Sequence, residues 1–111
     1  MKVQSIVYVT EMGRSQDWYG KVFGTSPAFA SDMWTPFELG DATVALHRTA
    51  NLSQGSRCDL SLVTDLPLEV TVRRLEEAGV TIERGIRDET FGRSILLRDP
   101  DGTPIQINEH D

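Results

Sequence analysis

The sequence predicts the same order of elements twice: one strand, one amphipathic helix and then three strands. In each half the helix ends at a glycine, Gly24 in the first and Gly79 in the second, because glycine most readily takes the left-handed conformation beyond a helix. A chain of 111 residues has room for one small curled sheet per half, with a helix on its outer face. The repeat therefore predicts an α+β fold in which the other face of each sheet is concave and forms a candidate pocket.

Hydrophobic spacing defines the elements of the first half. Residues 3–10 alternate as a strand covered on both faces. Trp18, Tyr19, Val22 and Phe23 form one stripe of a helix over residues 14–23, and their spacing assigns these aromatic rings to the core, together with Phe37. Further strands are predicted at residues 27–30, 36–39 and 43–48, the last two joined by a tight turn at Gly40-Asp41.

The second half begins with a predicted strand at residues 59–64. Asp65 is the expected N-cap of a helix that carries Pro67 in its early turn and ends at Gly79. The segment Asp99-Pro100-Asp101-Gly102 is typical of a turn with proline at its second position. Three strands follow the helix, at residues 80–87, 93–98 and 104–108. The sequence is thus one domain, with module one at about 1–48, a linker at 49–57 and module two at about 58–111.

Composition excludes several classes of protein. Hydrophobic residues make up 39% and charged residues 25% of the chain, as in ordinary globular proteins. No apolar run is long enough for a signal peptide or a membrane span, so we expect a soluble, cytoplasmic protein. The single cysteine, Cys58, excludes an intramolecular disulfide. The net charge of −6 disfavours nucleic-acid and membrane partners; it favours a cationic ligand or simply keeps the protein soluble.

Three segments carry a family resemblance. Glu11, Trp18-Tyr19 and Val22-Phe23-Gly24 are similar to a "D…FY…LG" signature, Leu75-Glu76-Glu77-Ala78-Gly79-Val80 to "LEEAGV", and the segment from Arg98 to Gln106 to "RDPDGxxIE". Together they resemble the vicinal oxygen chelate superfamily of glyoxalases, bleomycin-resistance proteins and extradiol dioxygenases. The resemblance implies two βαβββ modules that form an eight-stranded half-barrel cleft with helices outside, commonly with two chains sharing the sites. The resemblance does not by itself imply an enzyme, because the superfamily includes both metalloenzymes and pure binding proteins.

The resemblance also implies where a metal would bind, in the first and last strand of each module. These positions are Gln4 and Ala45 in module one, and Asp59 and Gln106 in module two. Cys58 is an alternative to Asp59, but its register would turn Leu60 and Leu62 toward the cleft. Because alanine has no donor atom and amides are weak ligands, we expect no metal cofactor. The alternative is a divalent ion held by Gln4, Asp59 and Gln106 with waters, helped by His47.

Strand alternation predicts which side chains face the cleft. Trp34 and Phe91, in hairpins of the two halves, are candidates to stack on a planar ligand; the alternative is that each covers the core or a dimer contact. The predicted cleft face carries Gln4, Ile6, Tyr8, Glu38, Ala45, His47, Asp59, Ser61, Leu96, Gln106 and Asn108.

These features favour a metal-independent protein that sequesters an antibiotic or natural product, as the bleomycin-resistance branch of the family does. The expected ligand is aromatic and neutral or cationic, and the expected assembly is a homodimer, domain-swapped or not. The predicted ligand-binding residues are Tyr8, Trp34, Glu38, His47, Asp59, Ser61, Phe91, Gln106 and Asn108. A metal-dependent lyase, isomerase or dioxygenase is the alternative, and a degenerate regulatory module is a third possibility.

Overall fold

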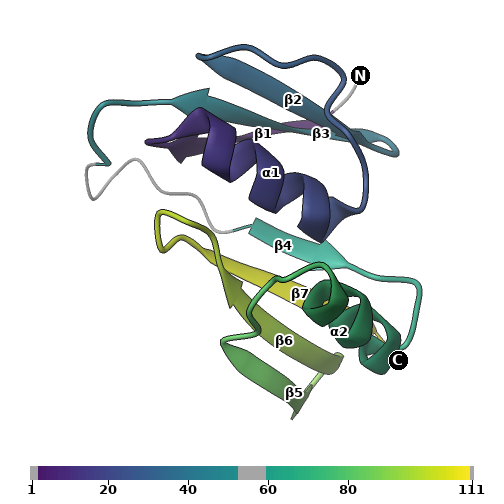
Figure 1. Ribbon diagram of the computed structural model, residues 1–111. Coiled ribbons are helices and arrows are strands. Elements are labelled where there is room, and N and C mark those ends of the chain that lie inside the picture. Colours follow the sequence, from purple (N-terminus) through teal and green to yellow (C-terminus); the bar gives the residue numbers. More distant parts are fainter. Residues whose placement is uncertain (1–2, 53–59, 111) are drawn as a thin grey trace. The chain divides into compact units, whose positions relative to one another are not determined.

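The computed structural model describes residues 3–52 and 60–110 (Figure 1). The chain divides into two compact units, Met1–Cys58 and Asp59–Asp111. Each unit contains one mixed sheet and one helix, and the first strand of each unit precedes its helix. This confirms the predicted α+β class, and a strand followed by a helix and further strands recurs in both units, but the first unit has two strands after its helix where three were predicted. Within the described ranges, neither helix is long and apolar enough to cross a membrane.

The first unit is a three-stranded sheet with one helix. Its central strand β3 pairs in parallel with β1 and antiparallel with β2. A parallel pair cannot be joined by a tight turn, so the chain crosses over through α1 before it returns. In chain order the elements are β1 (Val3–Val9), α1 (Met12–Phe23), β2 (Trp34–Leu39) and β3 (Ala42–Arg48).

One face of this sheet packs against α1 and forms the core of the unit. Phe37 and Tyr19 are fully buried, as predicted. The ring of Phe23 meets that of Phe37 at 5.2 Å between centroids, so the helix is fixed to β2 by aromatic packing. Trp18 is only half-buried and contacts Tyr19 edge-on at 4.9 Å, so its assignment to the core holds only in part. Gly24 ends α1 with a φ of 69°, as predicted.

The strand predicted at residues 27–30 does not form. A single ladder bond remains, in which the Ala28 N–H donates to the Pro36 carbonyl at 2.9 Å. Pro27 has no N–H to donate, and Phe29 is 58% exposed, so the segment has neither the hydrogen bonds nor the buried face that a strand requires. The described residues therefore contain seven strands, whereas eight were expected.

The second unit is a four-stranded sheet in the order β4-β7-β6-β5. β4 runs parallel to β7, and the other pairs are antiparallel. The Asp99-Pro100-Asp101-Gly102 turn joins β6 to β7 as predicted: the Asp99 carboxylate accepts the N–H groups of Asp101 and Thr103 at 2.9 and 2.8 Å. The elements are β4 (Leu60–Val63), α2 (Leu68–Glu77), β5 (Arg84–Glu89), β6 (Gly92–Arg98) and β7 (Pro104–His110).

Asp65 does not cap α2, so that prediction is wrong. The helix begins after Pro67, which places Asp65 outside the capping position. The first helical N–H, that of Leu68, instead donates to the Glu109 carboxylate of β7 at 2.7 Å. A residue 41 positions away in the sequence thus performs the role assigned to a neighbour.

Arg93 holds that capping carboxylate in place. Its guanidinium donates to both oxygens of Glu109, at 2.8 and 2.9 Å, and to both oxygens of Glu69 on α2, at 2.7 and 2.8 Å. Hydrogen bonds from Arg93 lower the pKa of Glu69 to about 2, from its ordinary 4.5. The same guanidinium, and then the Leu68 N–H, lower the pKa of Glu109. The carboxylates of helix and strand are therefore joined through one guanidinium.

We predict that acid weakens this connection. Because the folded pKa of Glu69 lies below its ordinary value, its contribution to stability is present above pH 4.5 and is lost as the pH falls through about 2. In the variant Arg93→Gln the Glu69 pKa returns toward 4.5, which NMR of the side-chain carboxyl carbon measures directly. The difference in unfolding free energy between wild type and variant narrows over the same pH range; a difference that stays constant contradicts the prediction.

Candidate functional site

The face of the first sheet that points away from α1, here called its helix-free face, carries most of the predicted module-one residues. Strand pairing places Ile6 beside Ala45, Tyr8 beside His47, and Trp34 on the other side of His47. Paired residues on adjacent strands point to the same face, so these side chains share one surface. Gln4, Pro36, Glu38 and Thr43 complete it.

Tyr8, His47 and Trp34 form an aromatic cluster on this face. The His47 ring lies between the other two, with centroids 5.4 Å from Tyr8 and 5.7 Å from Trp34. The three residues come from three neighbouring strands, β1, β3 and β2, and each is half-buried. A cluster of partly exposed rings on adjacent strands offers π-faces and ring edges to a planar molecule.

Hydrogen bonds fix the backbone of Trp34. It begins β2, whereas the sequence placed it in the preceding turn. The Ser31 hydroxyl accepts the Trp34 N–H at 3.0 Å and donates to the Trp34 carbonyl at 2.7 Å. The next residue, Thr35, donates to the Ser31 carbonyl at 3.3 Å. The start of β2 is therefore held locally before any ligand arrives.

Glu38 gives this face its carboxylate. Both of its oxygens lie 3.2 Å from the Thr43 hydroxyl on the neighbouring strand, while the residue itself is exposed. Gln4 is also exposed, at the far end of the same face from the aromatic cluster. The helix-free face of the first unit thus joins an aromatic end to a polar end.

The helix-free face of the second unit is a hydrogen-bonded polar surface. The Gln106 amide donates to Asn108 at 2.7 Å, and the Asn108 amide donates to the Ser61 hydroxyl at 2.6 Å. Asn108 is only 5% exposed, so its position in the middle of the sheet depends on these partners. Leu96 pairs with Gln106 and adds an apolar side chain. The structure therefore brings Ser61, Leu96, Gln106 and Asn108 together.

Sequence reasoning missed four further residues of this face, Arg84, Arg87, Glu89 and Ser94. A β-bulge between Arg84 and Arg87 shifts the register of β5 against β6, so simple alternation does not run through β5. Ser94 is on the regular strand β6, where alternation from Leu96 does predict its face. The Ser94 hydroxyl, which is fully buried, donates to Glu89 at 2.8 Å, and Arg87 donates to the same carboxylate at 2.7 Å. Arg87 and then Ser94 lower the pKa of Glu89.

Two predicted residues are not part of these groups. Phe91 lies in the turn between β5 and β6, where its ring meets His110 edge-on at 5.3 Å. Asp59, like Cys58, lies outside the described residues.

The described residues do not fit a metal centre. Among them no group of three histidine, cysteine, aspartate or glutamate side chains is close enough to hold an ion. Ala45 has no donor atom and is fully buried, and the Gln106 amide nitrogen is bonded to Asn108. The donor set that a transition ion requires is therefore lacking in the part of the chain that the structure describes.

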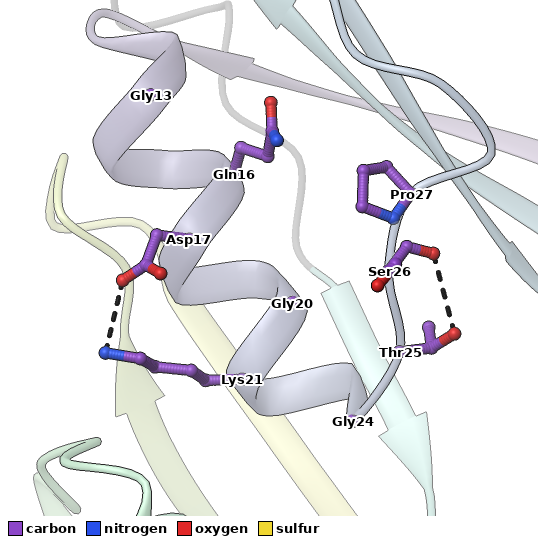
Figure 2. A pocket seen from close by; sticks show the side chains of 9 residues that line it. All are labelled: Gly13, Gln16, Asp17, Gly20, Lys21, Gly24, Thr25, Ser26 and Pro27. Carbon is purple, nitrogen blue, oxygen red and sulfur yellow. Dashed lines mark hydrogen bonds and ion pairs between the residues drawn. The ribbon is translucent and has the colours of Figure 1, made fainter.

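A groove lies on the opposite side of the first unit, between α1 and residues 25–27 (Figure 2). Its volume is about 470 Å³, and three glycines, Gly13, Gly20 and Gly24, are among the residues that line it. An ion pair between Asp17 and Lys21, 3.1 Å long, crosses its helical wall. A second depression of about 520 Å³ lies beside Pro67, Arg93 and Glu109 in the second unit. The aromatic cluster lines neither of them.

Comparison with known proteins decides the family. The profile of the Glyoxalase/Bleomycin resistance protein/Dioxygenase superfamily matches residues 3–107. This chain belongs to that superfamily. The resemblance seen in the three sequence motifs is thereby confirmed, and the superfamily accounts for the two successive strand–helix–strand units.

Individual relatives include both resistance proteins and enzymes. The chain is 28% identical to the phenazine antibiotic resistance protein EhpR of Enterobacter agglomerans, over 92% of this chain and 86% of that protein. A glyoxalase/bleomycin resistance protein of Catenulispora acidiphila superposes with a TM-score of 0.83 at 19% identity, covering 100% of this chain and 99% of that one. Lactoylglutathione lyase of Agrobacterium tumefaciens gives 0.77 at 16% identity, covering 98% and 92%. At these identities the two structures are evidence for the fold alone.

Proposed function

We propose that this protein sequesters a small planar antibiotic or natural product in the cytoplasm, without metal and without altering its ligand. The observation that carries the proposal is the aromatic cluster of Tyr8, His47 and Trp34 on the helix-free face of the first unit. All three rings are half-buried, so each keeps exposed area for a guest. Reversible capture needs apolar area for affinity and a few polar groups for orientation, and this face has both.

The charge of this surface is negative. Glu38 lies on the same face, and the whole chain carries a net charge of −6. A negative surface attracts cationic and hydrogen-bond-donating rings and repels anions. We therefore propose that the ring system held by the aromatic cluster is neutral or cationic.

The relative EhpR supports the choice of ligand class. Its name describes resistance to phenazine antibiotics, and phenazine is a flat tricyclic ring. A flat ring of this size matches a support built from three adjacent aromatic side chains. We accordingly propose phenazines as the first ligands to test, with resistance by sequestration as the biological role.

Tryptophan fluorescence tests the site, because the chain has only two tryptophans. We predict that an uncharged phenazine quenches wild-type emission in part, and that the variant Trp18→Phe, which retains only Trp34, loses a larger fraction of its emission. In Trp34→Phe the remaining emission from α1 is not quenched by direct contact. Loss of the indole weakens binding about tenfold, measured by calorimetry, because the stacking area is lost.

The opposite pattern would contradict the proposed site. If Trp18→Phe abolishes quenching and Trp34→Phe preserves it, the ligand binds beside α1. If calorimetry finds no binding by phenazines, or by bleomycin-, mitomycin- and enediyne-type compounds, sequestration of these classes is wrong.

The family also contains lyases and dioxygenases that use a divalent ion, so metal dependence needs its own test. We predict that protein purified without chelator holds iron, nickel, zinc and manganese far below one ion per chain, measured by plasma mass spectrometry. EDTA then leaves ligand affinity unchanged, because no described side-chain set fits the ion. A stoichiometric ion, removed by EDTA together with an activity, would establish the metalloenzyme alternative.

We further propose that the protein is a homodimer. Phe29 is 58% and Met33 51% exposed in the loop that replaces the missing strand, and apolar side chains of this size favour burial against a partner. Light scattering coupled to size exclusion is expected to give twice the chain mass of 12.4 kDa, and the double variant Phe29→Ser/Met33→Ser is expected to shift it toward one chain. If the wild-type protein has the mass of one chain, the proposed dimer is wrong. If the double variant keeps the mass of two chains, the interface is on another surface, which includes an interface made by domain swapping.

A further inference from the structure

Arg84 is the first residue of β5 and lies beside the β-bulge of that strand. The bulge turns Arg84 and Arg87 to the same face of the sheet. Arg84 pairs with Leu96 and therefore belongs to the helix-free face, together with Ser94, Gln106 and Asn108. Its side chain is half-buried. Among the described residues it forms no direct ion pair, although Arg87, Arg93 and Arg98 each do, and its charge acts on Glu89 only through space.

Neutral acceptors hold the Arg84 guanidinium. One terminal nitrogen, Nη1, donates to the carbonyls of Gly85 and Ser94, at 2.9 and 3.3 Å. The other, Nη2, donates to the Ser94 hydroxyl at 2.9 Å. The bonds to Ser94 use one hydrogen of Nη1 and one of Nη2, at the end of the guanidinium group. The Nε hydrogen and the second Nη2 hydrogen, which lie along one side of the group, are not used by these bonds. These two hydrogens point in parallel, which is the geometry that both oxygens of one carboxylate accept.

The residues behind Arg84 fix it in that orientation. Ser94 has no exposed surface, and its own hydroxyl proton goes to Glu89 at 2.8 Å. Glu89 is bound in turn by Arg87 at 2.7 Å. This chain of hydrogen bonds keeps the Ser94 oxygen directed at Arg84 as an acceptor. Two guanidinium groups against one carboxylate leave the cluster with excess positive charge, in a chain whose net charge is −6.

An apolar side chain stands beside the guanidinium. Leu96 is the direct cross-strand neighbour of Arg84 and is half-buried, so the anion would have an apolar wall next to it. An inorganic anion has no apolar surface to bury against Leu96, whereas the hydrocarbon part of an organic acid gains binding free energy by such burial. We propose that the helix-free face of the second unit is a recognition site for the carboxylate of a small organic acid, with Arg84 as the bidentate donor and Ser94 as its positioning residue.

The site is made of second-unit residues, whereas the aromatic cluster is made of first-unit residues, and it is tested with different probes. Benzoate and benzamide have the same ring and nearly the same shape, but only benzoate carries the charge. In an NMR titration of the full chain, we expect benzoate to shift the Arg84 Nε–H resonance and the backbone amides of Ser94 and Leu96, and benzamide to leave them unchanged. Arg84→Gln is expected to weaken benzoate binding about tenfold or more, because a charge-assisted pair is lost.

Two variants serve as controls. Arg73→Gln removes the same charge from an exposed position of α2 and is expected to bind benzoate like wild type, which excludes a general effect of net charge. Arg84→Lys keeps the charge but has no planar fork, and we expect it to recover only part of the affinity. Should Arg84→Gln fail to fold, the wild-type Arg84 resonance and the lysine variant decide the question. Equal shifts by benzoate and benzamide, no shift with either, or full affinity in Arg84→Gln would overturn the site, whatever phenazines do at the aromatic cluster.

Discussion

Parallel pairing of the first strand with the last strand of each unit determines where everything else lies. β1 beside β3 and β4 beside β7 require a crossover, and in both units the crossover contains the helix. The helix then buries one face of its sheet, through Phe37 in the first unit and through Ile95 and Leu97 in the second. The other face is left without a helix. The aromatic cluster and the Arg84 site are both on the helix-free face of their own unit.

The sequence predicted this arrangement well because its strongest signals are periodic and local. Alternation identified the face that carries Tyr8, Ala45 and His47, and the glycine at residue 24 marked the end of α1. The Asp99 turn was predictable because proline, aspartate and glycine each have a local reason to occupy their positions. Superfamily membership followed from such motifs, and the match over residues 3–107 is the finding that establishes it.

Interactions between distant residues were not predictable in this way. The cap of α2 comes from Glu109 and not from Asp65, because a carboxylate placed by β7 and held by Arg93 reaches the first helical N–H. Arg84 was missed because one extra residue between Arg84 and Arg87 breaks the alternation of side chains along β5, whereas Ser94 lies two residues before Leu96 on the regular strand β6 and could have been predicted. Gly85 lies inside this bulge, and an isolated glycine within a strand is the one local signal that could have pointed to it.

The missing strand of the first unit explains why the helix-free faces of the two units differ in chemistry. In the two sheet orders, β1-β3-β2 and β4-β7-β6-β5, β1 corresponds to β4, β3 to β7 and β2 to β6. Residues 27–30 therefore occupy the place in the sequence that β5 occupies in the second unit. There the chain keeps only the ladder bond from the Ala28 N–H to the Pro36 carbonyl, and the described residues form no strand. β5, with a full ladder and a bulge, carries Arg84, Arg87 and Glu89. The two units share one frame, and the bulged fourth strand gives only the second a guanidinium cluster on its helix-free face, whereas the first carries the three rings there with Glu38, which Thr43 holds.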